Sequence, residues 1–309
     1  MNTLHFKYAV EIEKTGSISK AAENLYMGQP ALSRTIKELE NSLGITIFKR
    51  TSTGVVPTKK GSEFLVYAKN ILSQLSEMEA LYKENKKDTQ RLTISVPRSS
   101  YVSKAFSRFL RQLDPELDIN IRYKETNSTR TLNKLSIGEY NLGIVRYETI
   151  YEDYFIKTFE EKKFSYEPLW EFECVVVMNK NHPLADCDSI SINDLSSYIE
   201  LAHGDNIIPY LTGENTQINA NSEDFSKRIY IFERGSQFDL LLNIPESYMV
   251  VAPVPNDVLE RHGLVQKKLS ASIQWYKKDV LVYRNSYNLT DLDKKLIRHI
   301  KDVINETAK

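Results

Sequence analysis

One face of a short segment near the N-terminus carries side chains that can read a base sequence. Glutamine and arginine hydrogen-bond the edges of adenine and guanine in the major groove, while serine and lysine contact bases or phosphates. Four such residues recur at helical spacing: Gln29, Ser33, Arg34 and Lys37. The opposite face is apolar and would pack into a core, with Leu32, Ile36, Leu39 and Leu43 at the spacing of a helix.

Two short helices joined by a tight turn would present this polar face to DNA. Ser17 can cap the first helix, in which Ala21 and Ala22 are small enough for close packing. Gly28 is an acceptable N-cap for the second helix. A helix-turn-helix that places its second helix in the major groove explains the arrangement, and it puts Pro30 among the DNA-binding residues. The alternative is a buried helical hairpin with no role in DNA binding.

A β-hairpin is predicted directly after the second helix. Residues 46–49 and 55–57 flank Thr53 and Gly54, which is a hairpin signature. Together with a first helix over residues 4–14, the hairpin makes the segment a winged helix-turn-helix. We therefore place Arg50 and Thr53 of the wing among the residues expected to bind DNA.

These residues resemble the N-terminal domain of the LysR-type transcriptional regulators. The shared pattern comprises Gly16-Ser17, Ala21-Ala22, Leu25, Gln29-Pro30-Ala31-Leu32-Ser33, Ile36, Leu39-Glu40, Leu43-Gly44, Phe48, Arg50, Thr58 and Gly61. Gly28 is a departure, because Ser or Thr is expected ahead of the Gln-Pro pair. The resemblance implies a sequence-specific regulator whose first partner is double-stranded DNA.

Composition and charge set the outer limits of the interpretation. The 309 residues suffice for two or three domains, and 41% hydrophobic with 27% charged residues is ordinary for a globular protein. The formal net charge is zero, yet residues 1–65 hold nine basic and six acidic side chains, so positive charge gathers at the candidate DNA-binding end. Two cysteines, no apolar run of membrane length and no signal-peptide layout predict a cytoplasmic protein that has no membrane partner.

A long helix is expected from Thr58, which can cap it, to about residue 87. Its apolar residues lie alternately four and three positions apart: Phe64, Ala68, Ile71, Leu75, Met78 and Tyr82. This heptad seam predicts a parallel or antiparallel coiled-coil pairing surface. The alternative is a stripe packed against a domain of the same chain. The resemblance favours dimerisation, because this family dimerises through its linker helix.

The pattern changes after a polar hinge over residues 84–90. Strands are expected over residues 91–96, 117–123, 142–145, 174–178, 228–232, 248–252 and 275–283, and helices over 102–113, 129–137, 192–197, 237–243 and 291–304. Such alternation implies parallel sheets with crossover connections. The arrangement resembles a two-lobed, periplasmic-binding-protein-like α/β fold in which the last strand and helix return to the first lobe.

The predicted organisation therefore has three parts. A winged helix-turn-helix DNA-binding domain covers residues 1–58, and a linker and dimerisation helix covers residues 59–89. An α/β effector-binding domain covers residues 90–309. Its lobe I comprises about residues 90–160 and 268–309, and its lobe II about residues 161–267.

No phosphate-binding loop, nucleophile elbow or metal-ligand spacing is present, so no cofactor, metal or catalytic residue is predicted. The cleft between the lobes is the default ligand site, and a helix start beside it suits an anion. The candidate effector-binding residues are Arg98, Ser99, Ser100, Tyr101, Arg146 and His203. Each has an alternative role as a helix cap or a surface residue, and Asp205 or Glu148 could pair with either arginine.

The sequence thus predicts a transcriptional regulator, not an enzyme, whose DNA binding responds to a small, anionic effector. The resemblance implies self-association as a dimer or homotetramer, and RNA polymerase is a further expected partner. The rival interpretation is a metabolite-binding or enzymatic α/β protein with an accessory helical domain. A third is a constitutive regulator with a vestigial pocket.

Overall fold

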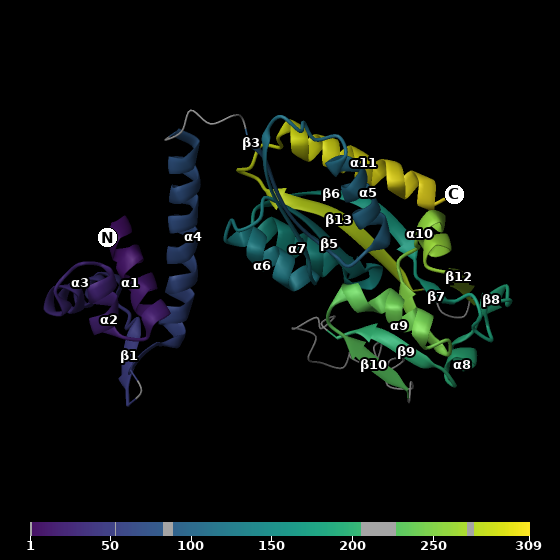
Figure 1. Cartoon of the computed structure of the whole chain (residues 1–309), viewed down its shortest axis with the longest axis horizontal. Coiled ribbons are helices and arrows are strands. Elements are labelled where there is room, and N and C mark those ends of the chain that lie inside the picture. The colour runs from purple at the N-terminus through teal and green to yellow at the C-terminus, as the bar shows by residue number, and fades with distance from the viewer. Residues whose placement is uncertain (1, 53, 83–88, 205–226, 271–274) are drawn as a thin grey trace. The chain divides into compact units, whose positions relative to one another are not determined.

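A computed structural model of the chain describes residues 2–52, 54–82, 89–204, 227–270 and 275–309. The chain forms two compact units, the first over residues 1–87 and the second over residues 88–136 and 140–309 (Figure 1). Two predicted site residues fall outside what is described: Thr53, and the side chain of Tyr82 at the end of its helix.

The first unit is a small helical domain with a two-stranded wing and a long terminal helix. Its elements are α1 (Thr3–Thr15), α2 (Ile18–Asn24), α3 (Gln29–Leu43), the antiparallel strands β1 (Phe48–Thr51) and β2 (Gly54–Pro57), and α4 (Lys59–Tyr82). Ser17 caps α2 by accepting the amide of Lys20, and Gly28 precedes α3 without a side-chain cap. The apolar faces of these helices share one core, which contains Ala9, Ile12, Ala21, Leu32, Ile36, Leu39, Ile47 and Leu65.

The start of α4 is fixed against the wing. The Thr58 hydroxyl accepts the Gly61 amide (2.9 Å) and donates to the Thr46 carbonyl (2.6 Å), so Thr58 caps the helix as the sequence predicts. Gly61 is required here because a Cβ at this position would lie 1.9 Å from the Ile47 carbonyl oxygen. These contacts anchor the long helix to the domain that precedes it.

One half of the second unit is a five-stranded sheet of order β4-β3-β5-β13-β6. Its strands are β3 (Thr89–Val96), β4 (Asp118–Glu125), β5 (Leu142–Glu148), β6 (Phe164–Glu173) and β13 (Tyr276–Arg284). Helices α5 (Ser100–Leu110) and α11 (Asp291–Thr307) lie together against the sheet and share one core with it (Figure 1). Helices α6 (Ser128–Ser136) and α7 (Glu152–Glu161) contribute to a second core with β5 and β13.

The other half is a six-stranded sheet of order β10-β9-β11-β7-β12-β8. Its strands are β7 (Val175–Asn179), β8 (Ser189–Ile190), β9 (Ile199–His203), β10 (Arg228–Ile231), β11 (Ser247–Val251) and β12 (Leu264–Leu269). Its helices are α8 (Ile192–Leu195), α9 (Gln237–Asn243) and α10 (Asn256–Arg261). The last strand and helix of the chain, β13 and α11, belong to the five-stranded half, which gives the expected two-lobed α/β fold.

The structure differs from the sequence prediction at the boundary between the lobes. Strand β6, within residues predicted for lobe II, pairs with β13 in the five-stranded sheet of lobe I. The chain therefore enters lobe II only at Val175 instead of near residue 161. Both sheets are also mixed, because β13 is antiparallel to β5 and β6, and β7 is antiparallel to β11 and β12.

Candidate functional site

Helix α3 separates an exposed polar face from a buried apolar face. Gln29, Pro30, Arg34 and Lys37 are exposed, and Ser33 is half-buried. On the other side, the apolar residues predicted to face the core are 5% exposed or less at Leu32, Ile36 and Leu39. Because its apolar face is buried, α3 is held in place and keeps its polar side chains in fixed positions, as recognition of the major groove requires.

Glu40, which is not among the predicted site residues, holds the wing to α3. Glu40 Oε1 accepts the backbone amides of Ile47 (2.6 Å) and Phe48 (3.1 Å), where the chain enters β1. Arg50, predicted to bind DNA, is exposed on the same strand. Glu40 therefore positions the wing relative to the recognition helix, and its place in the family pattern was the only sequence signal for this role.

The predicted heptad seam on α4 divides into an internal and an exposed part. Ala68 is 1% exposed, and the Phe64 ring lies 5.9 Å from the ring of Phe6 on α1, so these two residues pack within their own unit. Farther along, Ile71 is 40% and Met78 49% exposed. Tyr67, which the heptad reading omitted, is 62% exposed one turn before Ile71.

In the second unit, four of the six predicted effector residues, Arg98, Ser99, Ser100 and Tyr101, lie at the start of α5. Ser99 is the N-cap of this helix but makes no capping hydrogen bond with its side chain. The residue is only 5% exposed, and its hydroxyl is buried without a hydrogen-bond partner among the described atoms. A buried hydroxyl that is left unpaired beside free helix amides marks a place where a ligand atom would gain contacts.

Two arginines bridge the lobes at this point. Arg98 of lobe I donates from Nη2 to the carbonyl of Phe232 in lobe II (2.7 Å). In the opposite direction, Arg234 donates from Nη2 to Ser100 Oγ (3.0 Å) and pairs through Nη1 with Glu125 Oε1 (2.6 Å). Arg234 is not among the predicted site residues, because its bridging role depends on partners more than one hundred positions away.

His203 lies at the end of β9 in lobe II. Its ring Nδ1 is 2.9 Å from Nε2 of Gln237, which is 4% exposed at the start of α9. The ring is thus held in place by a neighbouring element, and it is half-buried.

Arg146 and Tyr101 occupy different positions from those predicted for direct ligand contacts. Arg146 forms a bidentate pair with Asp279, with Nε to Oδ1 at 2.7 Å and Nη2 to Oδ2 at 2.6 Å, and the Tyr101 hydroxyl donates to the same carboxylate. Asp279 and Tyr101 have no exposed surface. Burial, and then the Asp279 charge, raise the pKa of Tyr101 well above its usual value, so the phenol stays protonated. The carboxylate that pairs with Arg146 is therefore Asp279, and Asp205, one of the two acidic partners considered from the sequence, lies outside the described residues.

A cavity of about 410 Å³ extends between the lobes along α5. It reaches Ser100 and Arg234 and continues to an interlobe ion pair between Lys104 and Asp257 (2.6 Å). Lys104, Arg108, Arg111, Arg234, Arg261 and His262 line it, against Asp257 as the lining carboxylate. Its volume suits a small metabolite, and its charge favours an anion.

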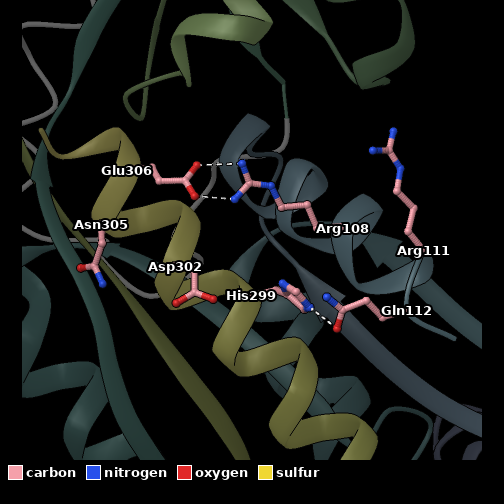
Figure 2. A pocket seen from close by; sticks show the side chains of 7 residues that line it. All are labelled: Arg108, Arg111, Gln112, His299, Asp302, Asn305 and Glu306. Atoms are coloured by element: carbon pink, nitrogen blue, oxygen red, sulfur yellow. Dashed lines mark hydrogen bonds and ion pairs between the residues drawn. The ribbon is translucent and has the colours of Figure 1, made fainter.

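A second groove of about 560 Å³ lies between α5 and α11 (Figure 2). Two of its charged side chains pair across the groove, because Arg108 forms a bidentate pair with Glu306 (2.6 and 2.8 Å). His299 Nε2 also lies 3.0 Å from Gln112 Oε1 across the groove. These contacts join the two helices. The interlobe cavity is the better candidate for a ligand because it reaches Ser100, one of the predicted effector residues, whereas the groove reaches none of them.

Two features are absent from the described residues. None of their helices is both long and apolar enough to cross a membrane. No group of three or more histidine, cysteine or acidic side chains in these parts of the chain is arranged to hold a metal ion.

A winged helix-turn-helix combined with a two-lobed α/β unit defines a DNA-binding regulator with a ligand-binding domain. Comparison with known families supports this class: residues 4–62 match the model of bacterial regulatory helix-turn-helix proteins of the lysR family, and residues 85–206 match the LysR substrate binding domain. The chain belongs to the LysR family of transcriptional regulators.

Individual relatives agree with this assignment. The HTH-type transcriptional regulator AlsR of Bacillus subtilis is 25% identical over 99% of this chain and 96% of its own length. A probable RuBisCO transcriptional regulator of Cyanophora paradoxa is 30% identical over 60% of this chain and 55% of its own. These relatives are transcriptional regulators.

Two full-length solved structures share the fold. CbnR complexed with its target DNA superposes with a TM-score of 0.59 at 13% identity, covering 98% of this chain and 100% of that one. A full-length OxyR variant from Pseudomonas aeruginosa superposes with a TM-score of 0.57 at 19% identity, covering 97% of this chain and 98% of that one.

Proposed function

We propose that this regulator reads an inverted-repeat operator through two copies of its first unit. Gln29, Ser33 and Arg34 contact base edges, and Lys37 and the wing residues Arg50 and Thr53 contact phosphates. The support is the exposed polar face of α3, which is fixed from behind by a buried apolar face. Pro30, the second residue of α3, favours the start of the helix that carries these side chains into the groove.

We further propose that α4 pairs two chains through an apolar stripe formed by the exposed residues Tyr67, Ile71 and Met78 and the half-buried Leu75. The first part of the predicted seam, Phe64 and Ala68, supports the stripe from within the unit instead. Contacts between effector domains would then assemble dimers into a homotetramer. Pairing matters for DNA binding because one head covers only one half-site.

The effector of this proposal is a small anion, such as a carboxylate, bound between the lobes at the start of α5. The observation that carries it is the buried, unpartnered hydroxyl of Ser99 beside the free amides of an eleven-residue helix. The interlobe cavity adds basic side chains, among them Arg234, which now holds Ser100. His203 and Arg98 flank the ligand, whereas Arg146 and Tyr101 shape the cleft from behind through Asp279.

Binding of such an anion would compete with Glu125 for Arg234 and so alter how the lobes are bridged. A ligand that prefers one lobe arrangement shifts the population toward it, which changes how the two heads meet DNA. The protein acts in the cytoplasm without catalysing a reaction, and RNA polymerase is its partner at the promoter. These last assignments follow from the role of a DNA-binding regulator.

A screen of metabolites by thermal shift tests the effector assignment. We expect anions to raise the melting temperature of the second unit, and the double change Ser99→Ala, Ser100→Ala to abolish the shift while DNA binding without ligand stays intact. Ser136→Ala at the end of α6, which lies neither at the start of α5 nor in the cavity lining, is the matched control and should respond as the wild type does. A response only to neutral or cationic compounds, or a wild-type response in the double variant, would show the assignment to be wrong.

A further inference from the structure

The turn between α2 and α3 contains a tyrosine in a backbone conformation that favours glycine. Tyr26 has a φ of +53°, in the left-handed region. Its amide donates to the carbonyl of Glu23 (3.1 Å), and the next amide, of Met27, donates to the carbonyl of Ala22 (3.0 Å). This pair of bonds ends a helix in the Schellman manner, and the residue at its centre must be left-handed. A side chain there is unfavourable because its Cβ approaches the following carbonyl oxygen.

Two other helices in the same unit end at a glycine, which adopts the left-handed conformation without strain. Gly16 ends α1 with a φ of +62°, and Gly44 ends α3 with a φ of +65°. Among the described non-glycine residues, only Tyr26 and Lys163 have a positive φ. A glycine at position 26 would therefore relieve strain without disturbing the turn.

Nothing within the described fold compensates for the strained tyrosine. Its side chain is 98% exposed, so the ring buries almost no apolar surface against its own domain. A strained residue that gives no stability in return is a candidate for a role outside the fold.

The position of Tyr26 indicates what that role is. It precedes Gln29, the first residue of α3, by three positions, within the turn that leads into the recognition helix. In a helix-turn-helix on DNA, the second helix enters the major groove and the first crosses the sugar-phosphate backbone. The turn between them therefore faces the phosphates that flank the bases being read.

We propose that the Tyr26 phenol donates a hydrogen bond to a DNA phosphate beside the bases that α3 reads. The inference rests on the DNA-binding role of α3. Tyrosine hydroxyls are among the groups that contact phosphates and fix the register of a protein on the duplex. A neutral phenol displaces no condensed counterion, so this contact adds affinity without adding to the salt dependence of binding. It differs in that respect from a phosphate contact made by lysine or arginine.

The test compares full-length variants on two DNA probes: a duplex of random sequence, and a duplex selected by the wild-type protein from a random pool. Tyr26→Phe removes only the hydroxyl, and we expect it to weaken binding to both probes by about tenfold. The slope of affinity against salt concentration should not change. Tyr26→Gly should lose at least as much affinity, while the melting temperature of the first unit rises.

Lys163→Gly is the matched control, because it relieves the other left-handed residue, which lies exposed in the second unit. It should raise stability without changing DNA affinity. Wild-type affinity in Tyr26→Phe, or a loss confined to the selected duplex, would overturn the proposal. Arg34→Ala distinguishes failure of the Tyr26 proposal from failure of the α3 proposal. If Arg34→Ala no longer binds the selected duplex while Tyr26→Phe binds normally, α3 keeps its DNA-binding role and the role proposed for Tyr26 is wrong.

Discussion

The positive charge of Arg34 is not paired with an acidic side chain of its own domain among the described residues. It is exposed on α3 and forms no ion pair with other residues in the described ranges. Arg34→Ala should weaken binding to a selected duplex by about 1–3 kcal/mol if the guanidinium reads a base edge. A phosphate contact would instead weaken binding to every sequence and reduce the salt slope by about one. Fluorescence titration at several salt concentrations separates these results.

The matched control for this change is Lys295→Ala, which removes another exposed cation, from α11 in the second unit. That variant should bind DNA as the wild type does, and both variants should unfold at the wild-type temperature. Wild-type affinity in Arg34→Ala would remove α3 from its proposed role.

Asp279 stabilises the second unit by pairing with the largely buried guanidinium of Arg146 and accepting a hydrogen bond from Tyr101. Asp279→Asn would leave the Arg146 guanidinium, whose side chain is only 16% exposed, without a countercharge. Breaking a buried pair from one side costs about 3–5 kcal/mol, so urea unfolding of the second unit should shift by that amount. Tyr101→Phe removes one hydrogen bond and keeps the pair, and it should cost about 1–2 kcal/mol. Equal losses in the two variants would contradict this account.

The same residues show how far sequence analysis reaches at this scale. The position of Ser99 at a helix start is visible in the sequence, because a strand, a short loop and an amphipathic helix follow one another locally. The partner of Arg146 is not visible, since Asp279 lies 133 positions later and is brought there only by the return of β13. A local pattern therefore predicted an available arginine where the fold provides a buried ion pair.

At the scale of elements, α4 shows why a heptad pattern alone does not define an interface. Both the packing against α1 and the pairing with another chain require apolar residues at helical spacing. Phe64 and Ala68 serve the first purpose, and the exposed residues Ile71 and Met78 are available for the second. Only the three-dimensional structure separates the two sets.

Ile71→Glu places a charge in the exposed stripe of α4 and should break the association of two chains, because like charges would be buried against each other. Sedimentation at micromolar concentration should then show a smaller particle, and DNA affinity should fall sharply. Ser73→Glu places the same charge on another exposed face of the same helix and should leave the assembly intact. A wild-type monomer, or identical assembly in both variants, would contradict the pairing surface.

Several elements of the second unit were not predicted from the sequence, among them the amphipathic helix α7, which buries Phe155 and Phe159, and strand β6. Strand β6 runs from Phe164 to Glu173 and contains Pro168 with Glu167 and Glu171, a composition that argues against a central strand. It is tolerated because β6 forms the edge of its sheet, where one side of the backbone needs no partner. Missing this strand is what displaced the predicted boundary between the lobes.

At the scale of the whole molecule, the second unit is built so that a ligand can affect both lobes. The chain crosses between them twice, and polar side chains bridge them at Arg98, Arg234 and Lys104. The two lobes were predictable from the alternation of strands and helices and from the return of the last strand and helix. The bridging contacts were not, because each joins side chains from distant segments whose residue types are common on any surface.

Selection of DNA from a random-sequence pool by the full-length protein tests the central claim most directly. We predict a single enriched motif with two-fold symmetry, whose half-sites are separated by one or more helical turns of about 10–10.5 base pairs each. Arg34→Ala should lose or relax this motif at the bases that α3 reads. Recovery of sequences no different from the starting pool, or the same motif with unchanged preference in Arg34→Ala, would contradict the account of this protein as a regulator that reads DNA through α3.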